Sequence, residues 1–246
     1  MENETLLDQF KIDPIISFIG YLAAPIRGVI TRKTWLSGPD GVNVYPHQHR
    51  DFAQSDRETY HTFQKVSQTM TDILADYLGD SGKEWKDLLK GEPGDPLVQN
   101  GYARLRSMLY PKLSPDDLNN MEFDTNLKQW IRVRPHKDID VFTLQPFIEG
   151  SGLQFFLKSD GSPAEHKDPK GKWVTIPIPK HGILLTIGDD FRTSSEGLTD
   201  EQGHSLTMPA VLHRVSATKA ETEQDRYSFP YFVAQNFWKP MKTLKD

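Results

Sequence analysis

The residues QWIRVRPHKDIDVFTLQ (129–145) indicate the fold class. It contains two short runs, Gln129–Arg134 and Ile139–Gln145, that are rich in the β-branched and aromatic residues strands favour. His136 and Asp138 stand two residues apart at the junction between these runs. Because strands hold side chains on a rigid backbone, this junction is a place where the geometry of a binding site can be maintained.

Other short runs from about residue 101 onwards are also rich in residues that strands favour. They are Tyr102–Tyr110, Leu153–Leu157, Trp173–Ile178, Ile183–Ile187, Ala210–Val215 and Tyr227–Ala234. Turn-rich segments such as Ser159–Pro163 separate them. Eight short strands are typical of a double-sheet jelly roll. We therefore predict a mainly β, α+β protein with a jelly-roll core over residues 101–236.

The preceding region, residues 1–100, reads as mostly helical. Apolar side chains recur at helical spacing between Tyr60 and Leu78, and Ser55 with Glu58 has the pattern of a capping box. Gly79 is placed where a helix would end, and a short helix is expected over Lys83–Lys90. These helices are predicted to flank the jelly roll within a single domain of residues 1–246.

Composition excludes several classes of protein. The chain has 246 residues, a formal charge of −5 and no cysteine. The acidic balance argues against a nucleic-acid partner, and the lack of cysteine excludes disulfide scaffolds, Cys-ligated metals and thiol nucleophiles. The longest apolar stretch, residues 15–26, is too short to cross a bilayer, and the acidic start differs from a signal peptide. We expect a cytoplasmic protein with no membrane partner; the sequence leaves its oligomeric state open.

A metal site in this chain must use His, Asp and Glu. Eight histidines and 34 acids among 246 residues predict about one His-x-Asp/Glu pair by chance, and the chain has three: His49/Asp51, His136/Asp138 and His166/Asp168. Only the second pair lies next to predicted strands, and His213 lies inside another. Two histidines and a carboxylate can form the facial triad of non-haem Fe(II) oxygenases. On these residues alone, a structural histidine is an equally good interpretation.

Motifs around these residues follow a recognisable order. They are Arg106–Pro111, His136-Lys137-Asp138 with Phe142-Thr143-Leu144, Gly152-Leu153-Gln154, Trp173-Val174, Ile187-Gly188-Asp189, Leu212–Val215 and Arg226-Tyr227-Ser228. The ordered set, which covers roughly Asn43 to Asn236, resembles the isopenicillin N synthase-like branch of the 2-oxoglutarate- and Fe(II)-dependent oxygenases. The resemblance implies a double-stranded β-helix (jelly-roll) core, and Fe(II), 2-oxoglutarate and O₂ as cofactor and cosubstrates.

The resemblance also implies roles for individual residues. Fe(II) would be bound by His136, Asp138 and His213, and the distal carboxylate of 2-oxoglutarate by Arg226, Ser228 and Tyr110. A planar guanidinium suits that role because it matches a carboxylate with two parallel hydrogen bonds.

Three departures from the family pattern stand out. The N-terminal region, residues 1–100, looks abbreviated. Asp138 and His213 are 75 residues apart, wider than is usual, which indicates insertions at Lys158–Lys172 and Ser194–Met208. Met108 stands where the family has an asparagine, so one polar contact to the cosubstrate is missing.

Four arginines bear on the substrate. Strand alternation predicts that Arg104 and Arg106 share the face of Tyr110, and that Arg132 and Arg134 share the face of His136. A cationic cavity in an acidic protein favours a carboxylated substrate, with an amino-acid-like small molecule as the first candidate and an apolar plant-hormone- or flavonoid-like one as the second. The alternative is that some of these arginines lie at the rim or pair with Asp124 or Asp140.

The expected activity is therefore the oxidation of a C–H bond by hydroxylation, desaturation or oxidative cyclisation. Two other functions remain open. One is an oxidase like isopenicillin N synthase, which uses no 2-oxoglutarate. The other is a non-catalytic jelly roll that binds a small molecule.

Overall fold

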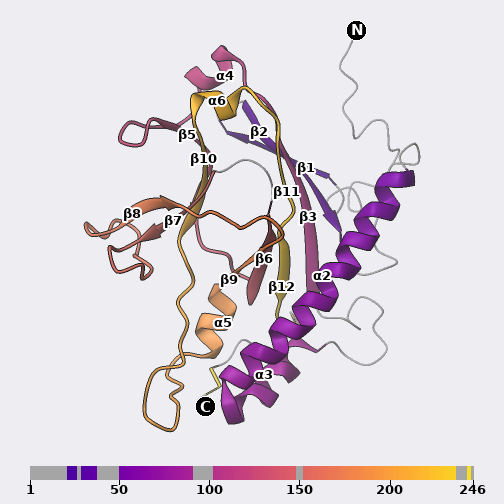
Figure 1. The fold of residues 1–246 in the computed structure, drawn as a ribbon, viewed down its shortest axis with the longest axis vertical. Coiled ribbons are helices and arrows are strands. Elements are labelled where there is room, and N and C mark those ends of the chain that lie inside the picture. Colours follow the sequence, from indigo (N-terminus) through magenta and orange to yellow (C-terminus); the bar gives the residue numbers. More distant parts are fainter. Residues whose placement is uncertain are drawn as a thin grey trace.

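Two antiparallel sheets form the centre of the protein (Figure 1). The computed structural model describes residues 21–26, 29–37, 50–90, 102–147, 152–236 and 243–244. The seven-stranded sheet has the order β1-β2-β3-β12-β6-β9, and β11 also pairs with β3. Its strands are β1 (Tyr21–Ile26), β2 (Val29–Ser37), β3 (Tyr102–Tyr110), β6 (Phe142–Pro146), β9 (Ile183–Ile187), β11 (Arg226–Ser228) and β12 (Tyr231–Ala234).

The second sheet has five strands in the order β4-β5-β10-β7-β8. They are β4 (Phe123–Asp124), β5 (Gln129–His136), β7 (Leu153–Leu157), β8 (Lys172–Thr175) and β10 (His213–Ala217). The two curled sheets confirm the predicted double-stranded β-helix. The predicted run Tyr227–Ala234 is split into β11 and β12 by a segment that contains Pro230, which has no N–H to donate to a ladder.

The prediction that residues 1–100 are mostly helical is wrong for residues 21–37. These residues form β1 and β2, and β2 extends the large sheet by pairing with β3, Thr34 opposite Met108. The run Val29-Ile30-Thr31 has β-branched residues that favour strands, but Arg32 and Lys33 interrupt the apolar pattern. Pairing with a distant strand decides the outcome here, and local periodicity does not reveal that partner.

The helices are α2 (Arg50–Tyr77), the 3₁₀ turn η1 (Gly79–Ser81), α3 (Gly82–Leu89), α4 (Pro115–Asn119), α5 (Asp189–Ser194) and α6 (Lys219–Thr222). Because α2 begins at Arg50, Ser55 lies inside the helix, and its predicted role as the N-cap is wrong. Gly79 does follow the end of the helix, with a φ of +58°. None of the helices in the described part of the chain is long and apolar enough to cross a membrane.

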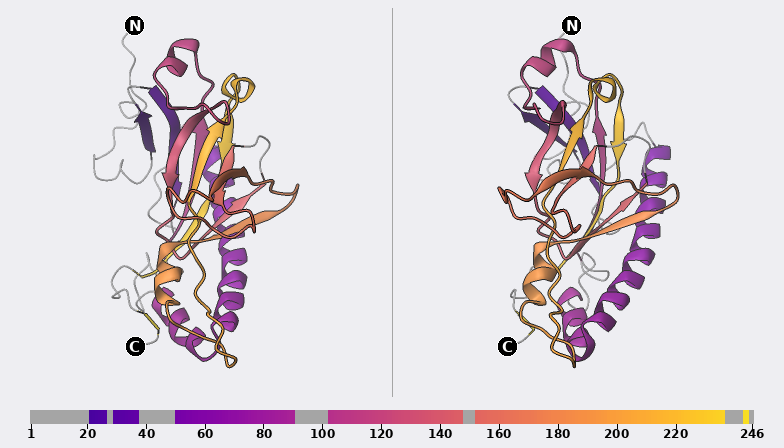
Figure 2. Two further views of the ribbon diagram at one scale, coloured as in Figure 1. Left: turned by 90° about the vertical axis from the view of Figure 1, so that its left-hand side faces the viewer. Right: turned by 60° about the vertical axis from the view of Figure 1, so that its left-hand side comes forward.

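Helix α2 covers the outer face of the large sheet (Figures 1 and 2). Its Tyr60 and Phe63 pack on Tyr231 of β12, with ring centroids 5.4 and 5.5 Å apart. Trp85 of α3 meets Phe191 of α5 edge to face at 5.1 Å. The main hydrophobic core therefore lies between the helices and the large sheet, and the opposite face of that sheet is left to line the space between the two sheets.

Gly152 closes the turn into β7. Its φ is +121°, and a Cβ atom added there would lie 2.5 Å from the backbone oxygen of Ser216. A side chain at this position would push apart β7 and β10, which pair Leu153 with Val215. The glycine is thus needed to keep β10, and with it His213, in its place in the small sheet.

Candidate metal centre

Three side chains converge at one end of the small sheet. His136 ends β5, His213 begins β10, and the two residues are register partners in the ladder. Asp138 follows β5 by two residues, and its Oδ1 lies 3.6 Å from Nε2 of His213 and 3.9 Å from Nε2 of His136. One ligand atom from each residue lies within 4.8 Å of the others. Of the histidine and acidic residues in the described ranges, these three form the one such cluster.

Backbone carbonyls set the tautomer of both histidines. Nδ1 of His136 lies 2.9 Å from the carbonyl oxygen of Arg134, and Nδ1 of His213 lies 3.0 Å from that of Val211. A carbonyl oxygen can only accept, so in the neutral imidazole the proton is on Nδ1 and Nε2 keeps its lone pair. Both lone pairs are therefore available to a metal ion, as expected for histidine ligands.

Asp138 is oriented by a hydroxyl group. The Thr143 Oγ1 donates to Oδ2 of Asp138 at 2.6 Å, which leaves Oδ1 for the centre of the cluster. The turn that carries Asp138 is held by the N–H of Asp189, which donates to the Asp138 carbonyl at 2.9 Å. Gly188 permits this approach, because a Cβ atom there would lie 1.7 Å from the carbonyl oxygen of Asp140. The residues present thus fit a divalent transition metal with two imidazoles, one carboxylate and open positions.

Replacing Thr143 with valine tests the role of this hydroxyl. The substitution keeps the shape of the side chain but leaves Asp138 Oδ2 without its donor. Loss of a partner that orients a metal ligand costs about 10- to 100-fold in metal affinity. We expect a loss of that size for Fe(II), measured by anaerobic titration. Unchanged affinity in Thr143→Val would show that the hydroxyl does not orient the ligand.

The structure describes the histidine of just one of the other two His-x-Asp pairs. His49 lies outside the described residues. His166 is exposed in a turn of the 158–171 segment, and no histidine or acidic cluster of the described chain includes it.

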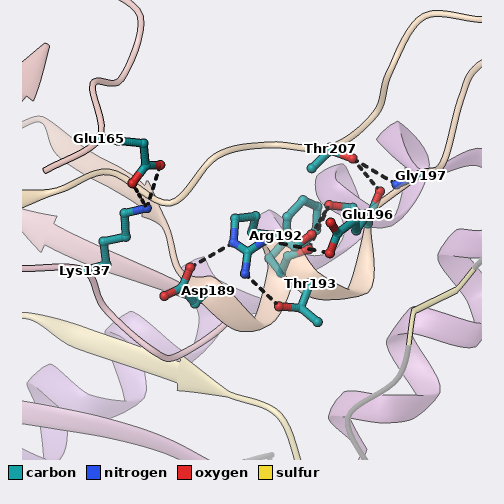
Figure 3. Close-up of polar contacts among 10 residues, drawn as sticks. Lys137, Glu165, Asp189, Arg192, Thr193, Glu196, Gly197 and Thr207 are labelled. Carbon is teal, nitrogen blue, oxygen red and sulfur yellow. Dashed lines mark hydrogen bonds and ion pairs between the residues drawn. The ribbon is translucent and has the colours of Figure 1, made fainter. Parts of the chain in front are cut away.

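The 158–171 segment is tied to the metal-site turn by an ion pair (Figure 3). Lys137, between His136 and Asp138 in the chain, donates to both carboxylate oxygens of Glu165, at 3.0 and 3.1 Å. Beside it, Arg192 of α5 donates to Asp189 Oδ1 at 2.9 Å. The first predicted insertion therefore borders the candidate site. The second, at 194–208, packs Leu198 and Met208 against the helical core.

A cavity of about 680 Å³ opens onto the three converging residues. Its lining includes all three of them, Tyr110 and Met108, and all four arginines singled out from the sequence: Arg104, Arg106, Arg132 and Arg134. The four arginines nevertheless occupy different environments.

Arg104 and Arg106 of β3 lie in the part of the cavity that contains acidic side chains. Arg104 Nη2 pairs with Asp140 Oδ1 at 2.5 Å, and the Arg106 guanidinium lies 4.9 Å from the centre of the Phe232 ring. Asp190, at the start of α5, also lines this part of the cavity. Burial and then the nearby Asp140 raise the pKa of Asp190 to about 6. This region therefore presents cationic and acidic groups together.

Arg132 and Arg134 do not share an environment. Arg132 is 1% exposed and donates from Nη1 to the Pro111 carbonyl at 2.7 Å. The side chain of Arg134 is 61% exposed and pairs with Glu122 at 3.5 Å. Two register shifts between β5 and β10 break the strict alternation on which the common face was predicted. Asp124, considered as a partner for these arginines, pairs with Arg214 at 2.7 Å.

The three residues expected to bind 2-oxoglutarate lie close together. Arg226 is the register partner of Tyr110, and its guanidinium lies 5.0 Å from the centre of that ring. The Tyr110 hydroxyl donates to the Met108 thioether at 3.7 Å, a weak acceptor. Ser228 donates to Gln145 Oε1 at 3.3 Å. Arg226 and Ser228 line a smaller cavity of about 320 Å³, which shares Gln145 and Leu153 with the larger one.

The sequence did not reveal three residues of the site: Thr143, which donates to Asp138, and Asp190 and Phe232, which line the cavity. Thr143 lies within a quoted motif, but its contact with Asp138 depends on the turn between β5 and β6. Asp190 comes from a helix about 50 residues further along the chain, and nothing in its local sequence indicates that it reaches the cavity.

The fold and the geometry define a class: a double-stranded β-helix with a two-histidine, one-carboxylate cluster at the mouth of its cavity. The family model of the 2OG-Fe(II) oxygenase superfamily matches residues 118–235, which include all three residues of the cluster. This part of the chain belongs to that superfamily, and the isopenicillin N synthase-like branch is consistent with it.

Named relatives agree with this assignment. The chain is 24% identical to gibberellin 3-beta-dioxygenase 1 of Pisum sativum, over 86% of this chain and 49% of that protein. It is 23% identical to flavonol synthase 3 of Arabidopsis thaliana, over 91% and 62% respectively. A Neurospora crassa protein solved with alpha-KG and thymine shares the fold, with a TM-score of 0.68 at 17% identity, over 99% of this chain and 70% of that one. The chain spans about half the length of the gibberellin dioxygenases that it matches.

Proposed function

We propose that the protein is a non-haem Fe(II)- and 2-oxoglutarate-dependent dioxygenase that oxidises a C–H bond of a small carboxylated, amino-acid-like metabolite. The observation that carries the proposal is the cluster itself: two imidazoles with Nε2 available, and a carboxylate oriented by Thr143, at the mouth of a cavity. The assignment of residues 1–246 to one oxygenase domain stays a prediction.

In this function the chain holds the metal and both organic substrates. His136, Asp138 and His213 would bind Fe(II) and leave open positions for substrate and O₂. With 2-oxoglutarate and O₂, the metal supplies an oxidant strong enough to remove hydrogen from a C–H bond. The protein supplies the positions of the reacting groups and a site that excludes water. Arg226, Ser228 and Tyr110 are proposed to bind the distal carboxylate of 2-oxoglutarate.

The charged wall of the cavity supports the choice of substrate class. Arg106 lies over Phe232, where it can bind a carboxylate by two parallel hydrogen bonds. Arg104 pairs with Asp140, and Asp190 offers an acceptor for an ammonium group on the same side. Cationic and acidic groups together suit a zwitterion such as an amino acid. The names of the gibberellin and flavonol relatives support the second candidate, an apolar plant-hormone- or flavonoid-like substrate.

Replacing Arg106 with methionine tests the substrate class. The change keeps an extended side chain that can contact Phe232 but removes the charge. We expect the KM of a carboxylated substrate to rise by about 10- to 150-fold, since a hydrogen bond to a charged group contributes about 1.5–3 kcal/mol. Uncoupled decarboxylation of 2-oxoglutarate should change little. The control is Arg57→Met, at an exposed arginine of α2 outside the cavity lining, which should keep the wild-type KM. An unchanged KM in Arg106→Met would contradict the assignment.

The activity itself is tested by O₂-dependent release of CO₂ from 2-oxoglutarate, measured with and without candidate substrates. The proposal requires CO₂ release that depends on Fe(II) and increases with the substrate. An oxidase would consume O₂ with its substrate and need no 2-oxoglutarate. A non-catalytic binding protein would bind small molecules without consuming O₂. The mass of the product then distinguishes hydroxylation from desaturation and cyclisation.

A further inference from the structure

Arg132 is a buried cation whose hydrogen bonds are incomplete. Its side chain is among the largest that are fully buried in the described residues, at 1% exposure. Nη1 donates to the Pro111 carbonyl, but Nη2 is buried without a hydrogen-bond partner. An unsatisfied charged group in a protein interior is costly. A buried guanidinium of this kind indicates a binding position for an anion.

The charges around Arg132 make that position more specific. Burial, and after it the positive charge of Arg226, lower the pKa of Arg132 to about 10, so it remains cationic at neutral pH. Two acidic residues are also near. Asp225 accepts from the Lys112 N–H at 2.7 Å, and Glu221 accepts from Thr218 in the capping box of α6. Arg132 donates to the carbonyl of Pro111, and Arg226 lies against Tyr110, the residue before it. An anion bound beside these neighbouring residues would be stabilised by both guanidinium groups.

The two arginines come from opposite sheets and meet around Tyr110. Arg132 lies on β5 of the small sheet, and Arg226 on β11 of the large sheet, where it pairs with Tyr110 of β3. Arg132 and Tyr110 both line the cavity onto which the candidate metal ligands open. The Tyr110 hydroxyl donates only weakly, to the Met108 sulfur at 3.7 Å, so it can turn to an anion placed here.

We propose that Arg132 binds the distal carboxylate of 2-oxoglutarate together with Arg226, one guanidinium from each sheet. The inference rests on the proposed function, because it assumes 2-oxoglutarate as the cosubstrate. It assigns Arg132 to the cosubstrate, whereas the sequence placed it among the substrate-binding arginines. The inference also explains how the chain can have Met108 where the family pattern has an asparagine. The guanidinium of Arg132 on β5 would supply the polar contact to the cosubstrate that the asparagine on β3 would otherwise make.

The test compares two ligands that differ only at the distal carboxylate. 2-Oxoglutarate and 2-oxopentanoate, in which a methyl group replaces that carboxylate, are titrated calorimetrically without O₂ into the Mn(II)-loaded protein. Wild type should prefer 2-oxoglutarate. Arg132→Met should reduce this preference by about 10- to 150-fold, the value of a hydrogen bond to a charged group. Its affinity for 2-oxopentanoate should change little.

Matched variants separate binding from structure. Arg57→Met removes an exposed arginine of α2 that lines neither cavity, and it should keep the wild-type preference. Arg132→Gln, which is neutral but keeps a donor for the Pro111 carbonyl, should lose the preference as Arg132→Met does, and it serves if the methionine variant does not fold. Equal weakening of both ligands would indicate a structural role for Arg132 and overturn the inference.

The inference and the proposed function fail in different ways. If the preference is lost in Arg226→Met but kept in both Arg132 variants, 2-oxoglutarate remains the cosubstrate and only the role of Arg132 is overturned. If wild type does not bind 2-oxoglutarate, or binds the two ligands equally, both the inference and the proposed cosubstrate are overturned.

Discussion

Replacing His213 with alanine is expected to abolish Fe(II) binding and turnover while leaving the fold largely intact. The imidazole presents one of three ligand atoms that lie within 4.8 Å of one another, and its loss leaves one histidine and one carboxylate. Removing a ligand should weaken metal affinity by more than the roughly 10- to 100-fold that loss of a ligand's orienting partner costs. Anaerobic Fe(II) titration measures the effect, and circular dichroism checks the fold. His136→Ala should behave in the same way.

The controls are the histidines of the other two His-x-Asp pairs. His166→Ala and His49→Ala should bind Fe(II) and turn over as wild type does. His166 is the sharper control, because it also belongs to a His-x-Asp pair and is exposed in the segment that Glu165 ties to Lys137. If His166→Ala were inactive through loss of metal while His213→Ala retained the metal, the choice among the three pairs would be wrong.

The His136/Asp138 pair could be singled out because it lies next to strands that the sequence identifies well, whereas the grouping of His136, Asp138 and His213 as metal ligands came from the family resemblance. Three of the predicted strands, Tyr102–Tyr110, Leu153–Leu157 and Ile183–Ile187, have the observed bounds. His136 and His213 end up as register partners, a pairing that the predicted strands permit but do not determine. The predicted end of one helix at Gly79 also agrees with the structure, since it depends on local chemistry.

Features that depend on long-range pairing could not be predicted. β1 and β2 are strands through their pairing with β3, and the polar residues within β2 hide the pattern. The bulges between β5 and β10 have a larger consequence for the site. They leave Arg132 buried and Arg134 exposed, although the two residues are two positions apart on one strand. Alternation holds only for a regular ladder, and a bulge is set by both strands together.

Replacing Arg226 with alanine is expected to weaken the binding of 2-oxoglutarate by about 30- to 4,000-fold. Removing one partner of a desolvated charge pair costs about 2–5 kcal/mol, much of it because the other charge is left unpaired. At about 1.4 kcal/mol per factor of ten, this cost corresponds to the stated range. Arg132 would still face the carboxylate, which favours the lower part of the range. Fe(II) affinity should change little, because Arg226 is not in the metal cluster.

Two further substitutions give this result a graded form. Arg226→Lys keeps the charge but loses the planar pair of donors, so its 2-oxoglutarate affinity should fall between those of wild type and Arg226→Ala. Ser228→Ala removes one hydrogen bond to a charged group, so the free energy of 2-oxoglutarate binding should weaken by about 1.5–3 kcal/mol.

If the protein were an oxidase, the same substitutions would raise the KM of the substrate instead, because Arg226 and Ser228 would bind the substrate's own carboxylate. Titrating 2-oxoglutarate against wild type and Arg226→Ala therefore separates the two functions: an oxidase would turn over without 2-oxoglutarate, whereas a 2-oxoglutarate-dependent dioxygenase requires it.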